Sequence, residues 1–337
     1  MKNVTMRDIG QKAGVSAVTV SKALAGKPGM SEEVRRKILS IADEMHYQYP
    51  ASEALRLRNN LDIGILIWEP YFQADSFYSV MYKKLVTCLS ENGHYGILSL
   101  LTAEDEAALR PPRMTDTGHV DGLIILGQPS KTYYRMLGAA GTPTVFLDFY
   151  DEQGSADAVV GDNTYGCYRL TSHLIKNGHR DIGFVGNIHA TSSILDRYLG
   201  YYRALLLNGL ELRREWIISD RDGRNNLTEL VLPEKLPTAF VCNCDLIACR
   251  LMKALKARGL KVPDDISVTG FDDFTADDRP SVPLSTFRVD TDGMIELAVK
   301  AIAERCSGSH RPFGRTVVSG QPIYRESEIP LKTGVDH

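Results

Sequence analysis

The sequence contains little cysteine and no long apolar run. Its six cysteines are scattered over 337 residues, and although Cys242, Cys244 and Cys249 lie close together, no matching cluster of His or Cys accompanies them. That spacing is weak support for a metal site, so we expect buried free thiols and no metal. No apolar run approaches the ~20 residues that span a membrane, and the N-terminus lacks the apolar h-region of a signal peptide. We therefore expect a cytoplasmic protein with no membrane partner.

Sequence motifs of several enzyme classes are absent as well. The chain has no G-x-x-x-x-G-K-[ST] loop, no G-x-S-x-G elbow and no H-E-x-x-H pair. Four aspartates at 272, 273, 277 and 278 are typical of a solvated turn, and no ligand spacing occurs among His94, His119, His173, His179 and His189. We therefore expect neither an enzyme nor a cofactor.

Residues 5–24 predict two short helices joined by a tight turn. The first helix has one apolar face at helical spacing, formed by Met6, Ile9 and Ala13. Thr5 followed by Asp8 makes a capping-box pattern at its start, and Gly14 can adopt the positive φ that a sharp turn needs. A small helical hairpin that caps a globular domain is the alternative interpretation.

The second helix is expected to present a small, polar outer face. Ser16 can cap it, Val20 and Leu24 point inward, and the outward positions are Ala17, Val18, Ser21 and Lys22. Small apolar groups suit a thymine methyl, while hydroxyl and ammonium groups suit base edges and phosphates. This pattern predicts a helix that enters a DNA groove.

A third helix and a change of charge favour DNA binding over the hairpin alternative. Ser31 can cap a helix with apolar positions at helical spacing: Val34, Ile38, Ile41, Ala42 and Met45. Residues 1–60 contain ten basic and six acidic side chains, a net +4, whereas the rest contains 29 and 36, a net −7. A basic head on an acidic body fits a polyanion partner for the head alone. We expect a DNA-binding headpiece over residues 1–49.

Residues 50–60 are predicted to link the headpiece to the body. Pro50 ends what precedes it, and a short amphipathic stretch follows with Ala54, Leu55, Leu57 and two arginines. Such a stretch is too short to be a stable helix alone. We expect it to become ordered against DNA or a partner subunit, and an ordinary interdomain linker is the alternative.

From residue 61 to 332, continuous apolar runs alternate with amphipathic stretches. Strands are expected at 63–68, 95–101, 122–126, 144–147, 182–185, 216–218, 239–242 and 267–270, and helices at 77–90, 165–176, 193–207 and 245–258. This alternation predicts an α/β core with parallel sheets covered on both faces, and its length suits two doubly wound lobes. Ligands of such folds bind at the carboxyl ends of the strands, here in a cleft between lobes. The tail at 333–337 has no heptads, which favours a dimer over a coiled-coil tetramer.

Polar and aromatic side chains that follow these strands are the candidates for an effector site: Phe77, Tyr78, Asp148, Ser193, Arg197, Asp245 and Asp272. Carboxylates and an arginine beside aromatic rings suit a polyhydroxylated ligand, through charge-assisted hydrogen bonds and ring stacking. Structural roles are the alternatives: Asp245 as a helix N-cap, Phe77 as core, and Arg197 in an interlobe ion pair. A sugar or sugar derivative is favoured, with a nucleoside or purine second.

Six segments carry a family resemblance: VTMRDIGQKAGVSAVTVSKAL at 4–24, VDGLIILG at 120–127, HLIKNGHRDIGFVG at 173–186, DRYLGYYRAL at 196–205, GLKVPDDISVTGFDD at 259–273 and YRES at 324–327. Together they resemble the lactose-repressor (LacI/GalR) type of transcription regulator over essentially the whole chain. The resemblance implies a homodimer on a palindromic operator, with the headpiece in the major groove and a hinge helix in the minor groove. It also implies a core similar to periplasmic sugar-binding proteins, with a small effector between its lobes.

Carried over by position, the resemblance implies DNA contacts by Thr5, Ser16, Ala17, Val18, Thr19, Ser21 and Lys22, and by Ala54 and Leu57 of the linker. Leu57 falls where the family inserts a leucine between central base pairs. Arg197 and Asp272 match the most regular effector contacts of the family, and Ser193, Asp148, Phe77 and Tyr78 match more variable ones. The chain departs from the family pattern at Ala25, Ala51, Leu55 and Cys244, which puts hinge coupling and one corner of the cleft in doubt.

The mechanism implied by the resemblance is linkage between two sites. Effector binding changes the angle between the lobes, which alters the hinge segments and shifts operator affinity by a coupling of about 1–3 kcal/mol. Repression is the commoner outcome in the family. A soluble sugar-binding protein without regulatory DNA binding is the alternative, although such a protein has no use for a basic headpiece and normally carries an export signal.

Overall fold

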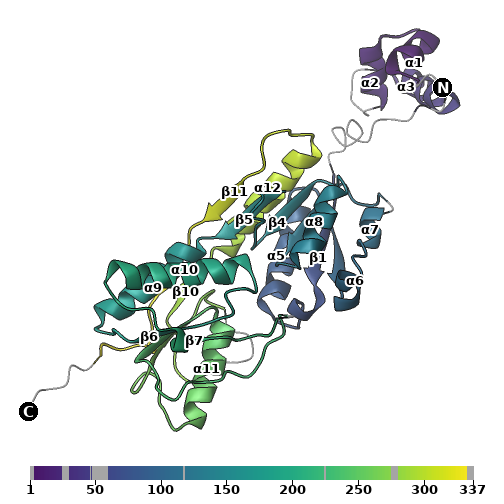
Figure 1. The fold of residues 1–337 in the computed structure, drawn as a ribbon. Helices are drawn as coiled ribbons and strands as arrows, with labels where there is room; N and C mark the ends of the chain where they lie inside the picture. The colour runs from purple at the N-terminus through teal and green to yellow at the C-terminus, as the bar shows by residue number, and fades with distance from the viewer. Residues whose placement is uncertain are drawn as a thin grey trace, which may run out of the picture.

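The chain folds into a three-helix headpiece and a core of two α/β lobes (Figure 1). The computed structural model describes residues 4–24, 30–45, 47, 60–116, 118–223, 225–274 and 280–331. Most of the predicted linker, including Ala51, Ala54, Leu55 and Leu57, lies outside these residues, as do Ala25 and the tail. No helix in the described ranges is long and apolar enough to cross a bilayer.

The headpiece consists of α1 (Met6–Ala13), α2 (Ala17–Leu24) and α3 (Glu32–Glu44). The predicted capping box is confirmed, because the Thr5 side chain accepts from the Asp8 amide while the Asp8 carboxylate accepts from the Thr5 amide. Gly14 ends α1 with φ 76°. The three helices bury one shared apolar core: Ile9, Ala13, Val20, Ala23, Ile38, Ile41 and Ala42.

The turn between α1 and α2 depends on a close backbone approach. Ser16 accepts a hydrogen bond of 3.1 Å from the Thr19 amide, as predicted for a cap, and Ser31 accepts one of 3.3 Å from the Val34 amide. A β-carbon on Gly10 would lie 2.7 Å from the carbonyl oxygen of Val15. Glycine at position 10 therefore lets α2 begin close against α1.

The first lobe, which we call the N lobe, contains an all-parallel sheet of order β11-β5-β4-β3-β1-β2. Its strands are β1 (Asp62–Trp68), β2 (Tyr95–Leu101), β3 (Gly122–Leu126), β4 (Thr144–Leu147), β5 (Asp157–Gly161) and β11 (Arg315–Val318). Its helices are η1 (Glu69–Tyr71), α5 (Phe77–Glu91), α6 (Ala103–Ala107), α7 (Arg113–Asp116), α8 (Lys131–Ala139) and α12 (Thr291–Cys306).

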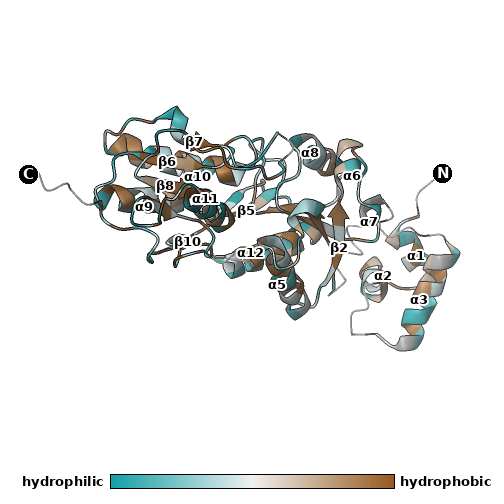
Figure 2. Cartoon of the chain, turned by 90° about the horizontal axis from the view of Figure 1, so that it is seen from below, coloured by the Kyte–Doolittle hydropathy of each residue, from teal (hydrophilic) through white to brown (hydrophobic). Residues whose placement is uncertain are grey.

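Strand β1 shows why helices cover both faces of this sheet. Ile63, Ile65 and Ile67 pack into the cluster that contains apolar residues of α5 and α12. Leu66 packs into a different cluster with Tyr133 of α8. Since successive side chains of a strand point to opposite faces, a continuous apolar run requires two covered faces. The apolar strands accordingly lie between helices with hydrophilic outer sides (Figure 2).

The second lobe, the C lobe, contains the parallel order β7-β6-β8-β9 and a separate antiparallel pair, β10-β12. Its strands are β6 (Ile182–Val185), β7 (Ile217–Ile218), β8 (Ala239–Cys242), β9 (Ser267–Thr269), β10 (Thr286–Arg288) and β12 (Gln321–Ile323). Its helices are α9 (Asn163–Lys176), α10 (Ser192–Leu207), η2 (Arg214–Trp216) and α11 (Asp245–Ala257). All eight predicted strands and all four predicted core helices are present, with ends that differ by at most two residues.

The described chain passes between the lobes three times, from β5 to α9, from β10 to α12 and from β11 to β12. Two of these crossings lie against each other, because the Asp162 amide donates a 2.9 Å hydrogen bond to the Val318 carbonyl. Each lobe is thus built from separate pieces of chain. The cleft lies where the carboxyl ends of strands from both lobes meet, the usual ligand position in such folds.

Gly200 is expected to be essential for the packing of α9 on α10. A β-carbon there would overlap with the carbonyl oxygen of Thr164, a rigid backbone atom. We expect Gly200→Ala to destabilise the core by about 1–3 kcal/mol or more, the usual cost of overpacking. The measurement is urea unfolding followed by circular dichroism. Gly138→Ala in α8 is the matched control, because no atom lies within 4 Å of its added carbon, and it should be neutral or slightly stabilising. Equal losses in the two variants would contradict this packing argument.

Candidate functional site

Two surfaces carry the residues predicted to function, and the first is the outer face of α2. Seven of the nine predicted DNA-facing residues are described, since only Ala54 and Leu57 fall outside. Val18 exposes 66% of its surface, Lys22 is exposed, and Ala17, Thr19 and Ser21 are half-buried. A methyl-rich, hydroxyl-bearing face with one ammonium group is able to contact thymine methyls, base edges and phosphates.

Three of the predicted DNA-contacting residues, Thr5, Ser16 and Thr19, also make hydrogen bonds at the N-termini of α1 and α2. The Thr5 hydroxyl lies 2.6 Å from the Asp8 carboxylate within the capping box. The Ser16 hydroxyl caps α2 and lies 2.8 Å from the Thr19 hydroxyl. Their predicted DNA contacts therefore have to be made by side chains that the caps already orient.

The second surface is the cleft, where Arg197 is the central cation. It projects from α10, is 5% exposed, and has every nitrogen engaged. Nε donates to the Asn163 carboxamide oxygen at 2.8 Å, Nη1 donates to the Asn243 carbonyl at 2.6 Å, and Nη2 lies 3.0 Å from Asp272 Oδ1. The guanidinium carbon also lies 4.1 Å from the centre of the Phe271 ring. Four contacts fix its position, which preorganises the charge.

Asp148, at the end of β4, contributes a second carboxylate from the N lobe. It is 5% exposed, and its Oδ2 accepts a 2.7 Å hydrogen bond from the Tyr78 hydroxyl. Tyr78 in turn stacks on Tyr71 with ring centres 5.1 Å apart. A carboxylate beside two stacked phenol rings offers hydrogen-bond acceptance and an apolar face together, which suits a sugar ring.

Burial dominates the electrostatics of the two carboxylates. It raises the pKa of Asp272 to about 7, since the opposing effect of Arg197 is incomplete and the charge of Asp148 adds to the rise. Burial likewise raises the pKa of Asp148, against the opposing effects of Arg197 and the Tyr78 hydrogen bond. One arginine thus faces two desolvated carboxylates, a charge arrangement that a ligand rich in hydroxyl donors can relieve.

The backbone of both carboxylates is held in the left-handed region. The φ angle is 70° at Asp148 and 105° at Asp272. Such conformations cost about 1–3 kcal/mol and persist where the surroundings fix them, often at binding sites. The strained turns after β4 and β9 set where the two carboxylates lie.

The side chains of two other predicted effector residues, Asp245 and Ser193, form hydrogen bonds within the C lobe. Asp245 begins α11, and its N-cap is Cys244, so the N-cap interpretation is wrong. The Asp245 carboxylate accepts instead from the Phe274 amide at 2.7 Å and from the Thr286 hydroxyl at 2.6 Å. The Ser193 hydroxyl lies 3.0 Å from that of Thr191. The polar atoms of both side chains thus bind groups of the C lobe itself, and neither residue lines the hollow described below.

A polar network after β7 was not predicted from the sequence. Asp220 is fully buried and binds Arg221 at 2.8 Å. It also accepts from the Asn187 amide and from the Asn243 carboxamide. The Arg221 guanidinium further donates to Asn225 Oδ1, and the Asn225 carboxamide donates to the Tyr71 hydroxyl of the N lobe. This network therefore ties the two lobes together across the cleft.

Other contacts between lobes surround the same region. The Ser192 amide donates to the Gln128 side chain at 2.7 Å, and Phe77 meets Phe274 with ring centres 5.7 Å apart. A hollow of about 420 Å³ opens there, with Phe77 and Asp272 among its lining residues. Tyr78, Asp148 and Arg197 are not among its lining residues, but they connect to those that are, through the Phe77–Tyr78 ring contact, the Tyr78–Asp148 hydrogen bond and the Arg197–Asp272 ion pair.

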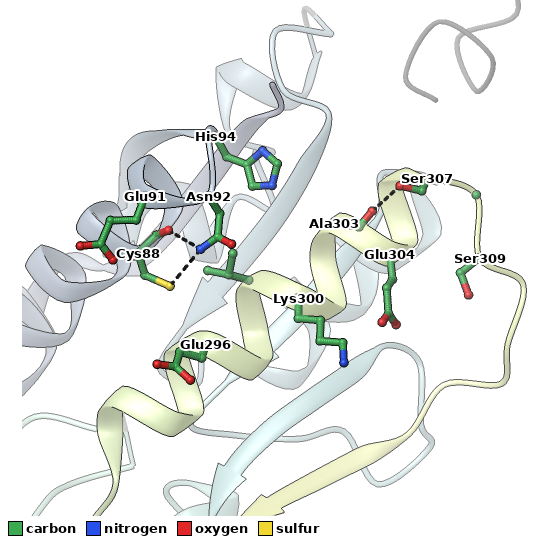
Figure 3. A pocket seen from close by; sticks show the side chains of 12 residues that line it. Cys88, Glu91, Asn92, His94, Glu296, Lys300, Ala303, Glu304, Ser307 and Ser309 are labelled. Atoms are coloured by element: carbon green, nitrogen blue, oxygen red, sulfur yellow. Dashed lines mark hydrogen bonds between the residues drawn. The ribbon is translucent and has the colours of Figure 1, made fainter. Parts of the chain in front are cut away.

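A second hollow, of about 860 Å³, lies on the outer side of the N lobe between α5 and α12 (Figure 3). It is lined by Cys88, Glu91, Asn92, His94, Glu296, Lys300 and neighbouring small residues, and by none of the predicted effector residues. The Asn92 carboxamide donates to the Cys88 carbonyl at 2.8 Å. Its open, exposed walls lack the buried, preorganised charges found in the cleft.

A helix-turn-helix headpiece joined to a two-lobed core with a charged cleft defines a class: transcription regulators that respond to a ligand. Comparison with known proteins agrees. Residues 5–49 match the family of bacterial regulatory proteins of the lacI type, and residues 171–328 match the periplasmic binding protein-like domain. The chain belongs to the lacI family and is a DNA-binding transcriptional regulator.

Similar proteins include the ribose operon repressor of Haemophilus influenzae, 29% identical over 97% of this chain and 99% of the relative. The HTH-type transcriptional repressor PurR of Glaesserella parasuis is 26% identical over 89% of each chain. These relatives are repressors rather than enzymes.

Solved structures share the fold. A complex of the transcriptional regulator CelR with cellobiose has a TM-score of 0.68 and 22% identity, covering 96% of this chain and 100% of that one. The lac repressor dimer bound to operator and the anti-inducer ONPF has a TM-score of 0.66 and 22% identity, covering 97% and 100%. At this identity they support the architecture of headpiece and two lobes.

Proposed function

We propose that this regulator is a homodimeric repressor of a palindromic operator, and that a small polyhydroxylated effector in the cleft controls its affinity for DNA. The observation that carries the effector proposal is the cluster of Arg197, Asp148 and Asp272 beside stacked tyrosines. In the same proposal the chain acts in the cytoplasm and catalyses no reaction, in line with relatives that are named as repressors.

The names of similar proteins support both halves of this proposal. One relative is a ribose operon repressor. Two structural neighbours hold sugars, cellobiose in CelR and ribose in a LacI family regulator from Enterococcus faecium, and a third is a dimer on its operator. A nucleoside or purine is the alternative effector, because stacked tyrosines and carboxylates can also hold a base.

The mechanism we propose is a change in the angle between the lobes. Arg197 and Asp272 belong to the C lobe, whereas Tyr78 and Asp148 belong to the N lobe. A ligand that contacts both pairs therefore links the two lobes. The interlobe bonds Ser192–Gln128 and Asn225–Tyr71 would then tighten or break. A shift in lobe angle moves the point where the N lobe begins, at Leu61, and with it the segment that leads to the headpiece.

The first test is selection of DNA by the purified full chain. The protein is incubated with sheared DNA from its own host, and bound fragments are sequenced. We expect one palindrome to be enriched, with sugar transport or catabolic genes nearby. A folded dimer that enriches no sequence, with or without a panel of sugars, nucleosides and purines, would contradict the repressor proposal.

Lys22 is expected to contact a phosphate of the operator. We expect Lys22→Gln to weaken binding about equally on different operator sequences, and to lower the slope of log affinity against log salt by about 1, because one counterion fewer is released. The measurement is fluorescence anisotropy on an enriched operator at several salt concentrations. Lys12→Gln is the control, since Lys12 pairs with Glu44 of α3 at 2.9 Å. An unchanged salt slope in the Lys22 variant would contradict the assignment.

A further inference from the structure

The cleft's charges restrict which effectors it can accept. Each described cation at its centre or rim is already paired with an aspartate. Arg197 lies 3.0 Å from Asp272, and Arg221 lies 2.8 Å from Asp220. In the hollow that opens beside Phe77, Lys84 lies 2.8 Å from Asp292 and Arg288 lies 2.7 Å from Asp273. Each of these cations thus has a carboxylate partner, although Asp273 also pairs with Arg325 at 2.7 Å. Arg224 and Arg279 lie outside the described residues.

Every nitrogen of the two central arginines already contacts a protein group. Arg197 donates to Asn163 and Asn243 besides its ion pair. Arg221 uses Nε and Nη2 on Asp220 and Nη1 on Asn225. Recognition of a phosphate or carboxylate ordinarily uses an arginine fork or an ammonium group that faces the ligand. Among the described residues of the cleft centre, both arginines are instead held by protein partners, including one aspartate each.

Asp148 is a carboxylate of the cleft that takes part in none of these ion pairs. It is 5% exposed, and the one side-chain hydrogen bond that it makes among described residues comes from the neutral hydroxyl of Tyr78. No described cation pairs with it, since the nearest arginine is bound to Asp272. A ligand anion in this cleft would therefore meet a desolvated carboxylate, and like charges brought together across a site cost several kcal/mol.

We infer that the effector carries no anionic group, and that the Asp148 carboxylate excludes phosphorylated and carboxylated ligands from the cleft. Hydroxyl or amine hydrogens of the effector donate to its free oxygen. The regulator thus senses an uncharged or amine-bearing sugar and ignores the phosphate or acid that metabolism makes from it. This inference rests on the proposed effector function of the cleft.

The test uses matched pairs of probes with the full-length protein. D-ribose is compared with D-ribose 5-phosphate, D-glucose with D-glucose 6-phosphate, and D-galactose with D-galacturonate, each by isothermal titration calorimetry. Tryptophan fluorescence is a second readout, because Trp68 lies edge-on to Tyr71 with ring centres 4.8 Å apart. In a pair with a binding neutral member, we expect the anionic member to bind about a hundredfold more weakly, as like-charge repulsion predicts.

The Asp148→Asn variant tests whether the Asp148 carboxylate is the group that excludes anionic ligands. Asparagine has the same shape and tolerates positive φ, so the backbone at φ 70° can be kept. We expect this variant to reduce the discrimination about tenfold or more, mainly by gaining affinity for the anion. Asp75→Asn is the control, since Asp75 also has positive φ, 52°, but is exposed on the surface. It should leave the discrimination unchanged.

Three outcomes separate the inference from the proposal beneath it. An anionic member that binds as tightly as its neutral partner would overturn the inference and leave the proposed function standing. Discrimination that persists in a folded Asp148→Asn variant would overturn the role of Asp148. Failure of every probe, charged and neutral, would overturn the sugar proposal and this inference together. The comparison in the unsubstituted protein decides the first point whether or not the variant folds.

Discussion

Replacing Arg197 with methionine is expected to abolish the effector response and to destabilise the core by about 3–5 kcal/mol, because removing one partner of a buried ion pair leaves an uncompensated charge. Arg197 is 5% exposed and faces Asp272 at 3.0 Å, with Asp148 opposite. Methionine keeps most of the volume, so the loss reports charge rather than a cavity. Urea unfolding measures stability, and the change in operator affinity caused by a binding sugar measures the response.

Two further variants show whether charge is the cause. In Arg197→Met with Asp272→Asn, the stranded carboxylate is gone, so we expect much of the stability to return while the effector response stays lost. Arg288→Met is the matched single control, because Arg288 pairs with Asp273 but is 56% exposed in its side chain, and exposed pairs contribute about 0–1 kcal/mol. A folded Arg197→Met protein whose operator affinity still changed on sugar binding would refute the central role of this arginine.

The strands could be predicted because their apolar runs are continuous. Ile63 to Trp68 and Gly122 to Leu126 have no competing helical spacing, and both form buried strands. Strand β5 and helix α12 were not predicted, although α12 has a sequence signal: Asp290 caps it, and Met294, Ala298 and Ile302 recur at helical spacing. Strand β5 is five residues long and pairs with β4 and β11, which no local pattern reveals.

The cleft residues that directly follow strands could be predicted from the sequence. Asp148 and Asp272 follow strands, and the carboxyl ends of parallel strands converge. The Asp220–Arg221 network was missed because it follows β7, only two residues long, and depends on a bridge between Arg221 and Leu227. The role of Asp245 was hidden as well, since its partner Thr286 lies 41 residues away.

The affinity for a neutral sugar is expected to rise about thirtyfold between pH 5.5 and pH 8. Burial raises the pKa of Asp272 to about 7, so its carboxyl is mostly protonated at pH 5.5 and ionised at pH 8. The ionised form accepts hydroxyl hydrogen bonds more strongly. If that form binds, the apparent Kd scales with the inverse of its population, which gives the thirtyfold figure. Isothermal titration calorimetry in buffers of different ionisation enthalpy also measures the proton released.

The stability of the unliganded core should change in the opposite direction. A carboxyl with a pKa raised on folding stabilises the folded state fully below its unfolded pKa, and that contribution is lost as pH rises from about 4 to 7. Asp272→Asn should therefore flatten both pH profiles. Asp273→Asn is the matched control: burial acts to raise the pKa of Asp273, but hydrogen bonds from Arg288 and Arg325 outweigh it and hold the pKa below its ordinary value. Its carboxylate stays ionised from pH 5.5 to 8, so this variant should keep the pH dependence of sugar binding. A constant Kd across that range in the unsubstituted protein would show that Asp272 is ionised throughout, and Arg197 would then be the stronger influence on its charge.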